Sequence, residues 1–215
     1  MRLGVVVGLA AEARIARRLG CPVGVGGGTL SGAEAAAERL VASGVDALLS
    51  FGLAGGLDPA LRPGALVVPL AVRTGGRRIA ADPALSARLG GVEVPLLLGA
   101  AHAVASAADK RLQFRQTRAV AVDLESGAVA RVAAAHGLPF AVLRAICDPA
   151  ERGLPPAAAS ALDAAGRIAL PAVLRSLAGN PLQIGALVGL ARQAGRARRA
   201  LVRRVGDLGG TLAGL

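Results

Sequence analysis

Three carboxylates, Glu12, Glu125 and Asp148, each come shortly after an apolar run that is short enough to be a buried strand. In an open α/β sheet, side chains just beyond the carboxyl ends of the strands face a shared ligand crevice. Three acids converging there would suit cleavage of a glycosidic bond, which needs an acid for the leaving group and negative charge beside a cationic sugar. Each acid also has an ordinary explanation, as a first-turn helix acid, a turn residue before Pro149 or a solvated helix position. The spacing alone leaves both explanations open.

The elements that must position these acids alternate through the first 150 residues in the manner of an α/β domain. We predict a single three-layer domain over residues 1–177, a twisted mixed sheet flanked by helices, followed by a basic amphipathic helix over 178–215. Strands are predicted at 3–8, 45–51, 65–72, 92–98, 119–122 and 140–145, and helices at 10–19, 31–43, 126–136, 156–177 and 181–208. A turn is predicted at Gly24–Gly28, and Ser31 with Glu34 has the pattern of a capping box.

The composition argues against several other classes of protein. The chain has three Phe and neither Trp nor Tyr, so it lacks the rings on which nucleic-acid bases stack. Its arginines would give only nonspecific, salt-sensitive binding to nucleic acid. Gly24–Gly28 lacks the third glycine of a dinucleotide fingerprint, and the sequence has no phosphate-loop lysine and no Gly-x-Ser-x-Gly elbow. The two histidines have no metal-ligand spacing, so we expect no metal site.

Cysteine usage and hydropathy indicate a compartment. Cys21 and Cys147 lie far apart, which favours a reducing environment over a disulfide framework. The apolar start is short and is interrupted by Glu12, unlike a signal peptide. No uncharged run reaches the roughly 18 apolar residues of a membrane span. We therefore expect a cytoplasmic protein, with peripheral contact at the inner face of the membrane as an option for its C-terminal end.

Four segments, in order along the chain, resemble motifs of the nucleoside phosphorylase and nucleosidase superfamily, which contains purine nucleoside phosphorylases and methylthioadenosine nucleosidases. They are Gly8-Leu9-x-x-Glu12, the glycine-rich segment 52–57 with the strand after it, Val122-Asp123-Leu124-Glu125-Ser126, and Arg144-Ala145-Ile146-Cys147-Asp148. The resemblance spans residues 1 to about 177. It implies a nucleoside-phosphorylase-like fold, cleavage of the N-glycosidic bond of a purine nucleoside, no resident cofactor, and a homodimer or larger oligomer.

The resemblance also implies a role for each site residue. Asp148 would hold or donate the proton at N7 of the purine, and Glu12 would orient or deprotonate an attacking water. Glu125 would bind the ribose hydroxyls beside Leu124, and its charge would favour an oxocarbenium-like transition state. Arg144 would position Asp148, with Cys147 beside them. Backbone amides would hold the water or a phosphate at Gly52, Ala54, Gly55 and Gly56.

Departures from the family pattern, such as Leu53 and Cys147 in place of serines, suggest an unusual substrate. Segments 8–14 and 122–127, with the basic C-terminal helix, look most like the hopanoid-associated phosphorylases, a branch linked to removing adenine from adenosylhopane to leave (phospho)ribosylhopane. The alternatives are a methylthioadenosine/adenosylhomocysteine-type nucleosidase, a general purine nucleoside phosphorylase, or a non-catalytic nucleotide-binding module of the same fold. Hydrolysis and phosphorolysis, with inorganic phosphate as co-substrate, both stay open.

The C-terminal helix carries much of the positive charge. The formal net charge is +11, and after residue 175 six Arg stand against Asp207 alone. Apolar residues form one helical stripe, at Leu187, Leu190, Ala194, Ala197, Leu201, Val205 and Leu208. Arginines follow the same rhythm on a neighbouring face, at Arg192, Arg196, Arg199 and Arg203. The helix either packs on the domain or on a dimer partner, or it holds the protein on an anionic membrane, in which case the domain should fold without it.

Overall fold

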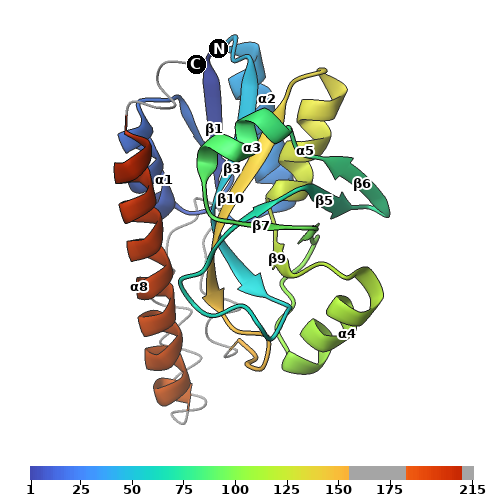
Figure 1. The fold of residues 1–215 in the computed structure, drawn as a ribbon, viewed down its shortest axis with the longest axis vertical. Coiled ribbons are helices and arrows are strands. Elements are labelled where there is room, and N and C mark those ends of the chain that lie inside the picture. Colours follow the sequence, from blue (N-terminus) through green and yellow to red (C-terminus); the bar gives the residue numbers. More distant parts are fainter. Residues whose placement is uncertain (155–182, 210–215) are drawn as a thin grey trace.

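The centre of the molecule is a set of three parallel strands in a computed structural model that describes residues 1–154 and 183–209. Strand β3 (Ala47–Gly56) pairs with β1 (Leu3–Val7) on one side and with β10 (Phe140–Asp148) on the other. Nearly all residues of these strands are buried, as their continuous apolar sequence predicts for strands covered on both faces. The carboxyl ends of β3 and β10 point to the same end of the molecule (Figure 1).

The rest of the sheet extends from this centre and is mixed in direction. The described residues form a ten-stranded sheet in the order β6-β5-β8-β9-β3-β10-β4-β7, with β1 beside β3 and β2 beside β1. The further strands are β2 (Val23–Val25), β4 (Leu66–Pro69), β5 (Ala71–Thr74), β6 (Arg77–Ala80), β7 (Val92–Val94), β8 (Leu97–Gly99) and β9 (Ala121–Asp123). The pairs β3–β9, β10–β4 and β5–β6 are antiparallel. The prediction of a mixed sheet is confirmed.

Helices cover both faces of the sheet. Alternate strand residues such as Leu48 and Val142 pack against α2 (Leu30–Ala42) and α5 (Ser126–Ala135) in one core cluster. Their neighbours Leu49 and Leu143 pack in a second cluster with three other helices, α1 (Ala10–Ala16), α3 (Pro83–Leu89) and α8 (Gln183–Leu208). A short 3₁₀ helix, Arg17–Leu19, follows α1. Figure 1 shows these two helical layers on opposite sides of the strands, so the three-layer prediction is confirmed.

Helix α4 (Ala107–Thr117) lies apart from the other helices, at the end of the molecule to which β3 and β10 point (Figure 1). It begins at Ser106, whose hydroxyl accepts a 2.9 Å hydrogen bond from the Asp109 amide. This helix was not predicted from the sequence, because its polar residues have no apolar stripe at helical spacing.

Several predicted boundaries were wrong. β3 continues through Gly52–Gly56, beyond the predicted strand end at residue 51, because β9 and β10 pair with it there. Val23–Val25 forms a strand beside β1 at the start of the predicted glycine turn. Thr29, not Ser31, is the N-cap of α2, and its hydroxyl accepts from the Gly32 amide. The predicted strands 65–72 and 92–98 are each divided in two, and β6 and α3 were not predicted. The predicted helix 156–177 lies outside the described residues.

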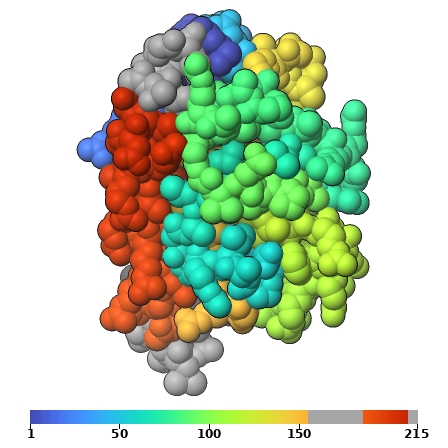
Figure 2. Space-filling model, in the orientation of Figure 1, coloured from blue at the N-terminus to red at the C-terminus, as the bar shows by residue number. Residues whose placement is uncertain are grey.

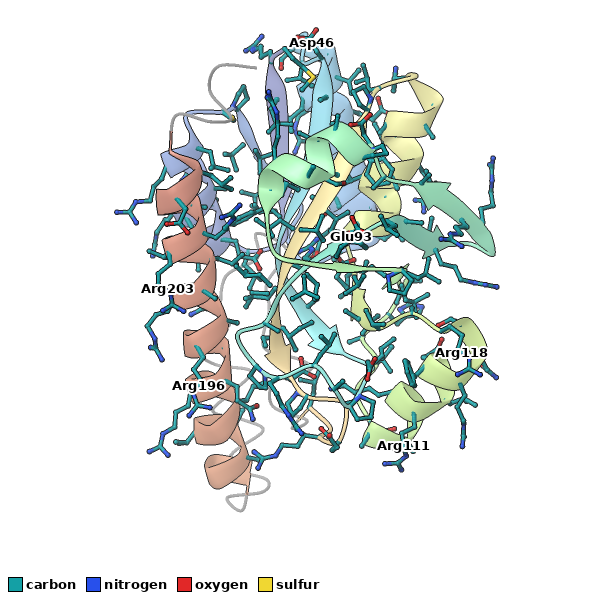
Figure 3. All side chains as sticks on the ribbon, in the orientation of Figure 1. Asp46, Glu93, Arg111, Arg118, Arg196 and Arg203 are labelled. Atoms are coloured by element: carbon teal, nitrogen blue, oxygen red, sulfur yellow. The ribbon has the colours of Figure 1, made fainter. Side chains whose placement is uncertain are left out.

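Helix α8 packs along one side of the domain, with four of its arginines exposed and Arg204 bonded to the Leu89 carbonyl. Its apolar stripe is buried over the C-terminal half, at Ala197, Leu201, Val205 and Leu208, in the core cluster beneath α1 and β10. Figure 2 shows the helix as a continuous ridge, and Figure 3 shows Arg196 and Arg203 directed away from the body. Arg192 and Arg199 are exposed as well. This favours packing for the apolar stripe and leaves the basic face uncovered by described residues. Among the described helices, none has the length and apolar character to span a bilayer.

Candidate active site

A cavity of about 220 Å³ opens where β3 and β10 end. The charged residues that line it are Glu12, Asp123, Glu125, Asp148 and Lys110. Much of the remaining wall is apolar, from residues such as Leu9, Leu53, Val104, Val122, Leu124 and Leu154. Acids at the ends of three strands do converge, as their positions in the sequence predict.

Glu12 is held rigidly at the first turn of α1. Its Oε2 accepts a 2.7 Å hydrogen bond from the Leu9 amide, and its Oε1 accepts a 2.8 Å bond from the Leu53 amide. A side chain at position 52 would not fit, since a Cβ on Gly52 would lie 2.6 Å from Glu12 Oε1. Burial raises the pKa of Glu12 above its ordinary value, against the opposing charge of Arg144 and the amide bonds. Glu12 is therefore a fixed carboxylate with an increased affinity for a proton.

Arg144 is the buried cation behind the site. Its side chain is 0% exposed, its Nε lies 2.6 Å from Asp123 Oδ2, and its Nη2 lies 3.1 Å from Glu125 Oε2. Nη2 also donates to Ser50 Oγ at 2.8 Å. The charges of Asp123, Glu125 and Glu12 raise the pKa of Arg144 despite its complete burial. One guanidinium does not neutralise three buried carboxylates, and the pKa values of Glu12 and Glu125 are raised.

Glu125 is the second carboxylate of this group with a raised pKa. Burial, together with the negative charges of Asp123 and Glu12, raises its pKa to about 8, and the ion pair with Arg144 only partly opposes the change. The chain approaches closely here, because a Cβ on Gly8 would lie 2.9 Å from Glu125 Cδ and would overlap its Oε1. The glycine at the end of β1 thus makes room for Glu125.

Asp148, at the end of β10, has a different partner from the one expected. Arg144 was expected to position it, but the ion pair of Asp148 Oδ2 is with Lys110 Nζ. Cys147 donates its thiol hydrogen to Asp148 Oδ1 at 3.1 Å. Burial and the adjacent carboxylate raise the pKa of Cys147 well above its ordinary value, which keeps it a thiol and a donor. The expectation for Arg144 was wrong. Residues four apart on a regular strand point to the same face, but the register of β10 shifts between Ile146 and Asp148, and a bulge of one residue turns Asp148 to the other face.

The structure brings together most of the predicted site residues. Those that line the cavity are Glu12, Ala54, Gly55, Leu124, Glu125, Cys147 and Asp148. Gly52 and Gly56 lie within β3, behind the wall, where Gly56 pairs with Ala121. The Leu53 amide, which lies between the predicted positions Gly52 and Ala54, is bonded to Glu12.

Sequence reasoning missed Lys110 and gave no role to Asp123. One signal was present for the first, because Lys110 is the single lysine among 25 basic residues. Asp123 lies inside a motif that was recognised, and its Oδ1 accepts a 3.0 Å hydrogen bond from the Ser126 amide. Its position against Arg144 depends on packing and could not be predicted from spacing.

Fold and site together define a class: an α/β protein whose mixed sheet presents paired acids to a small cavity. The family comparison agrees, because a model described as the phosphorylase superfamily matches residues 24–172. The chain belongs to this superfamily, whose enzymes cleave N-glycosyl bonds. A comparison with curated protein sequences gives no significant match.

Solved structures agree on the fold. A mutant of the Helicobacter pylori MTAN with 5′-methylthioadenosine in its active site superposes with a TM-score of 0.66 at 18% identity, over 96% of this chain and 98% of that chain. The futalosine hydrolase of the same organism gives 0.67 at 16% identity, over 96% and 97%. The Neisseria meningitidis 5′-methylthioadenosine/S-adenosylhomocysteine nucleosidase gives 0.68 at 17% identity, over 96% and 97%. The nucleoside-phosphorylase-like fold predicted from the motifs is confirmed.

Proposed function

We propose that this protein is a nucleosidase, which hydrolyses the N-glycosidic bond of an adenine nucleoside. The observation that carries the choice of water over phosphate is the charge of the cavity wall. Among the described residues that line the cavity, four are carboxylic acids and the one cation, Lys110, is already paired with Asp148. A phosphate dianion would meet acids without a free cation, whereas a neutral water would donate hydrogen bonds to them.

The roles follow from the geometry of each acid. Glu12, fixed by two amides, would take a proton from the attacking water. Glu125 would accept hydrogen bonds from the ribose hydroxyls. The excess negative charge that it shares with Glu12 and Asp123 around Arg144 would stabilise the cationic sugar of the transition state. Asp148 would deliver a proton to N7 of the purine, which makes the base a better leaving group.

The substrate we favour is adenosylhopane, with ribosylhopane as the product. The resemblance of segments 8–14 and 122–127 to the hopanoid-associated branch supports this choice, and the apolar wall suits a nucleoside with an apolar 5′ group. Methylthioadenosine is the second candidate, supported by the Helicobacter pylori structure that holds 5′-methylthioadenosine. Phosphorolysis stays the alternative reaction for either nucleoside.

The setting we propose is the cytoplasmic face of a membrane, with the protein as a homodimer or larger oligomer. A substrate with a hopane body partitions into lipid, and the exposed arginines of α8 would attract anionic headgroups.

The test is release of free adenine from adenosylhopane and from methylthioadenosine, with and without inorganic phosphate. We expect phosphate-independent release, and loss of activity in Glu12→Gln. Glu93→Gln is the matched control, because Glu93 is exposed on β7 and does not line the cavity. Strict dependence on phosphate with a tolerant Glu12→Gln would instead identify a phosphorylase. No release under either condition would refute N-glycosidic cleavage of these nucleosides.

A further inference from the structure

Lys110 is an unusual residue in an unusual place. It is the single lysine of the chain, its side chain is 1% exposed, and it is the one fully buried residue of α4. Lysine is rarely buried without a partner or a function. Lys110 lines the same cavity as the three acids assigned above, so its burial brings a cation to the reaction site.

The ammonium of Lys110 is fully bonded. It contacts the Asp148 carboxylate, the Pro149 carbonyl at 3.0 Å and the Arg152 carbonyl at 2.9 Å. An ammonium has three hydrogens to donate, and here each has an acceptor. These contacts attach the segment after β10 to α4 and hold the charge in one orientation.

The same contacts leave Asp148 without a proton of its own. Its Oδ2 receives Lys110 and its Oδ1 receives the Cys147 thiol, so both oxygens act as acceptors. A carboxylate bonded to an ammonium and to a thiol is the ionised form. A departing purine requires a proton, however, and an ionised Asp148 carries none to give.

We propose that Lys110 is the source of this proton and delivers it through Asp148, as a positioning residue that acts behind the residue touching the base. The proposal rests on the proposed function. The Lys110 ammonium on α4 is in direct contact with the Asp148 carboxylate at the end of β10, and both residues line the cavity.

The proton transfer conserves atoms and charge. An Nζ–H bond of Lys110 breaks and an O–H bond forms on Asp148, which passes that hydrogen to N7 of the purine. The electron pair of the C1′–N9 bond goes to the base, which leaves neutral. Water forms the new C1′–O bond and gives its proton to Glu12. After the products leave, Glu12 releases a proton to solvent and the neutral amine of Lys110 takes one up through Asp148.

The first test is the pH profile of adenine release by Lys110→Met, with whichever of methylthioadenosine and adenosylhopane the wild type cleaves. We expect kcat near neutral pH to fall by about 10²- to 10³-fold, with KM changed less than about threefold. The variant must protonate Asp148 directly from solvent, so its activity should recover toward acidic pH. Arg111→Met is the matched control, because it removes an exposed cation from the next position of α4. A loss by the same factor at every pH would overturn the proposal in favour of a structural role.

The second test asks whether the effects of the two substitutions on the rate add. It also covers the case in which Lys110→Met does not fold with Asp148 left as an unpaired buried charge, since the double variant removes both charges of the pair. Asp148→Asn and Lys110→Met/Asp148→Asn should cleave at rates within about twofold of each other, because the two residues act as one unit. A further loss of about tenfold or more in the double variant would overturn the proposal. If the wild type releases no adenine at all, the proposed function fails rather than this inference.

Discussion

At the scale of single residues, the site is governed by an excess of buried negative charge. Arg144 is surrounded by Asp123, Glu125 and Glu12, while the fourth acid, Asp148, has Lys110 as its own cation. Glu12 and Glu125 therefore have raised pKa values and hold protons more tightly than usual. This arrangement separates an acidic region that suits a cationic sugar from an ion pair that suits a leaving base.

Glu125→Gln should damage turnover more than binding. If the negative charge of Glu125 stabilises the oxocarbenium-like transition state, its loss removes an interaction that is stronger in the transition state than in the ground state. We expect a lower kcat with a smaller change in KM, measured by steady-state adenine release. A rise in KM at unchanged kcat would mean that Glu125 only recognises the ribose.

The same substitution should change the pH dependence of stability. The pKa of Glu125 is raised to about 8 in the folded protein from 4.5 in the reference state, so the folded state binds more protons between these values. Stability contributed by this group is then greatest below pH 4.5 and falls as pH rises toward 8. Glu125→Gln should therefore raise the free energy of unfolding relative to wild type at about pH 8.5 more than at about pH 4.5, as measured by urea denaturation. An equal difference at both pH values would contradict the assignment.

At the scale of elements, the site depends on close approach of strand ends. Gly8 follows β1 and faces Glu125, and Gly8 is not among the glycines with positive φ. Its backbone conformation therefore suits alanine, and the atoms nearest to an added Cβ all belong to the Glu125 carboxylate.

Gly8→Ala should impair activity without a large loss of fold stability. The added methyl must displace Glu125 from its position against Arg144, and we expect kcat/KM to fall by about tenfold or more, which corresponds to about 1.4 kcal/mol. Gly206→Ala is the control, because nothing lies within 4 Å of a Cβ at that position of α8. Full activity in Gly8→Ala would show that Glu125 has another productive position.

Helix α8 offers an independent prediction on stability. Gly195 lies in the middle of this 26-residue helix, and a Cβ there would contact only the end of the Arg199 side chain, at 3.6 Å. Gly195→Ala should stabilise the protein by about 0.5–1 kcal/mol, because alanine restricts the unfolded chain and favours helix. Thermal unfolding measures this, and a lower Tm would indicate that the helix is less regular than described.

At the scale of the whole molecule, the decisive feature is that α8 has two different faces, an apolar one packed on the domain and a basic one that is exposed. Its apolar stripe completes the core with Leu201, Val205 and Leu208, and each fully buried leucine stabilises the fold by about 1.5–3 kcal/mol. Removal of the helix should thus destabilise the domain, contrary to what a purely membrane-facing helix requires. The basic face, by contrast, is not covered by any of the residues 1–154 or 183–209, which is what the proposed contact with an anionic surface requires.

Binding to anionic vesicles is best tested by substitution. We expect the wild type to co-sediment with vesicles of phosphatidylcholine and phosphatidylglycerol at low salt, and binding to weaken when four exposed arginines of α8 become glutamine, namely Arg192, Arg196, Arg199 and Arg203. Each contributes about 1 kcal/mol near anionic lipid. The control changes the same number of exposed arginines elsewhere, at Arg77, Arg78, Arg111 and Arg115. Equal weakening by both sets would mean that only net charge matters.

The sequence by itself determined the features that are encoded locally. The central strands are continuous apolar runs and α5 and α8 have helical periodicity, so their type and order could be predicted. Glu12 and Asp148 could be placed in one cavity because the carboxyl ends of the parallel strands β1 and β10 meet at the same edge of the sheet. Glu125 reaches the same cavity from β9, which runs antiparallel to β3, so its place there depends on a strand pairing that the sequence pattern did not predict. α4 could not be predicted, because a polar helix without a stripe looks like a loop.

Only the tertiary structure decided which charges pair. Asp148 lies four residues from Arg144 and 38 from Lys110, yet Lys110 is its partner, because the Lys110 side chain reaches the end of β10 from α4 while Arg144 is directed to the other acids. The length of β3 was likewise set by pairing with β9 and β10, not by its glycine-rich sequence. Ion pairing and strand pairing depend on distances between segments remote in sequence, and local patterns carry no information on those distances.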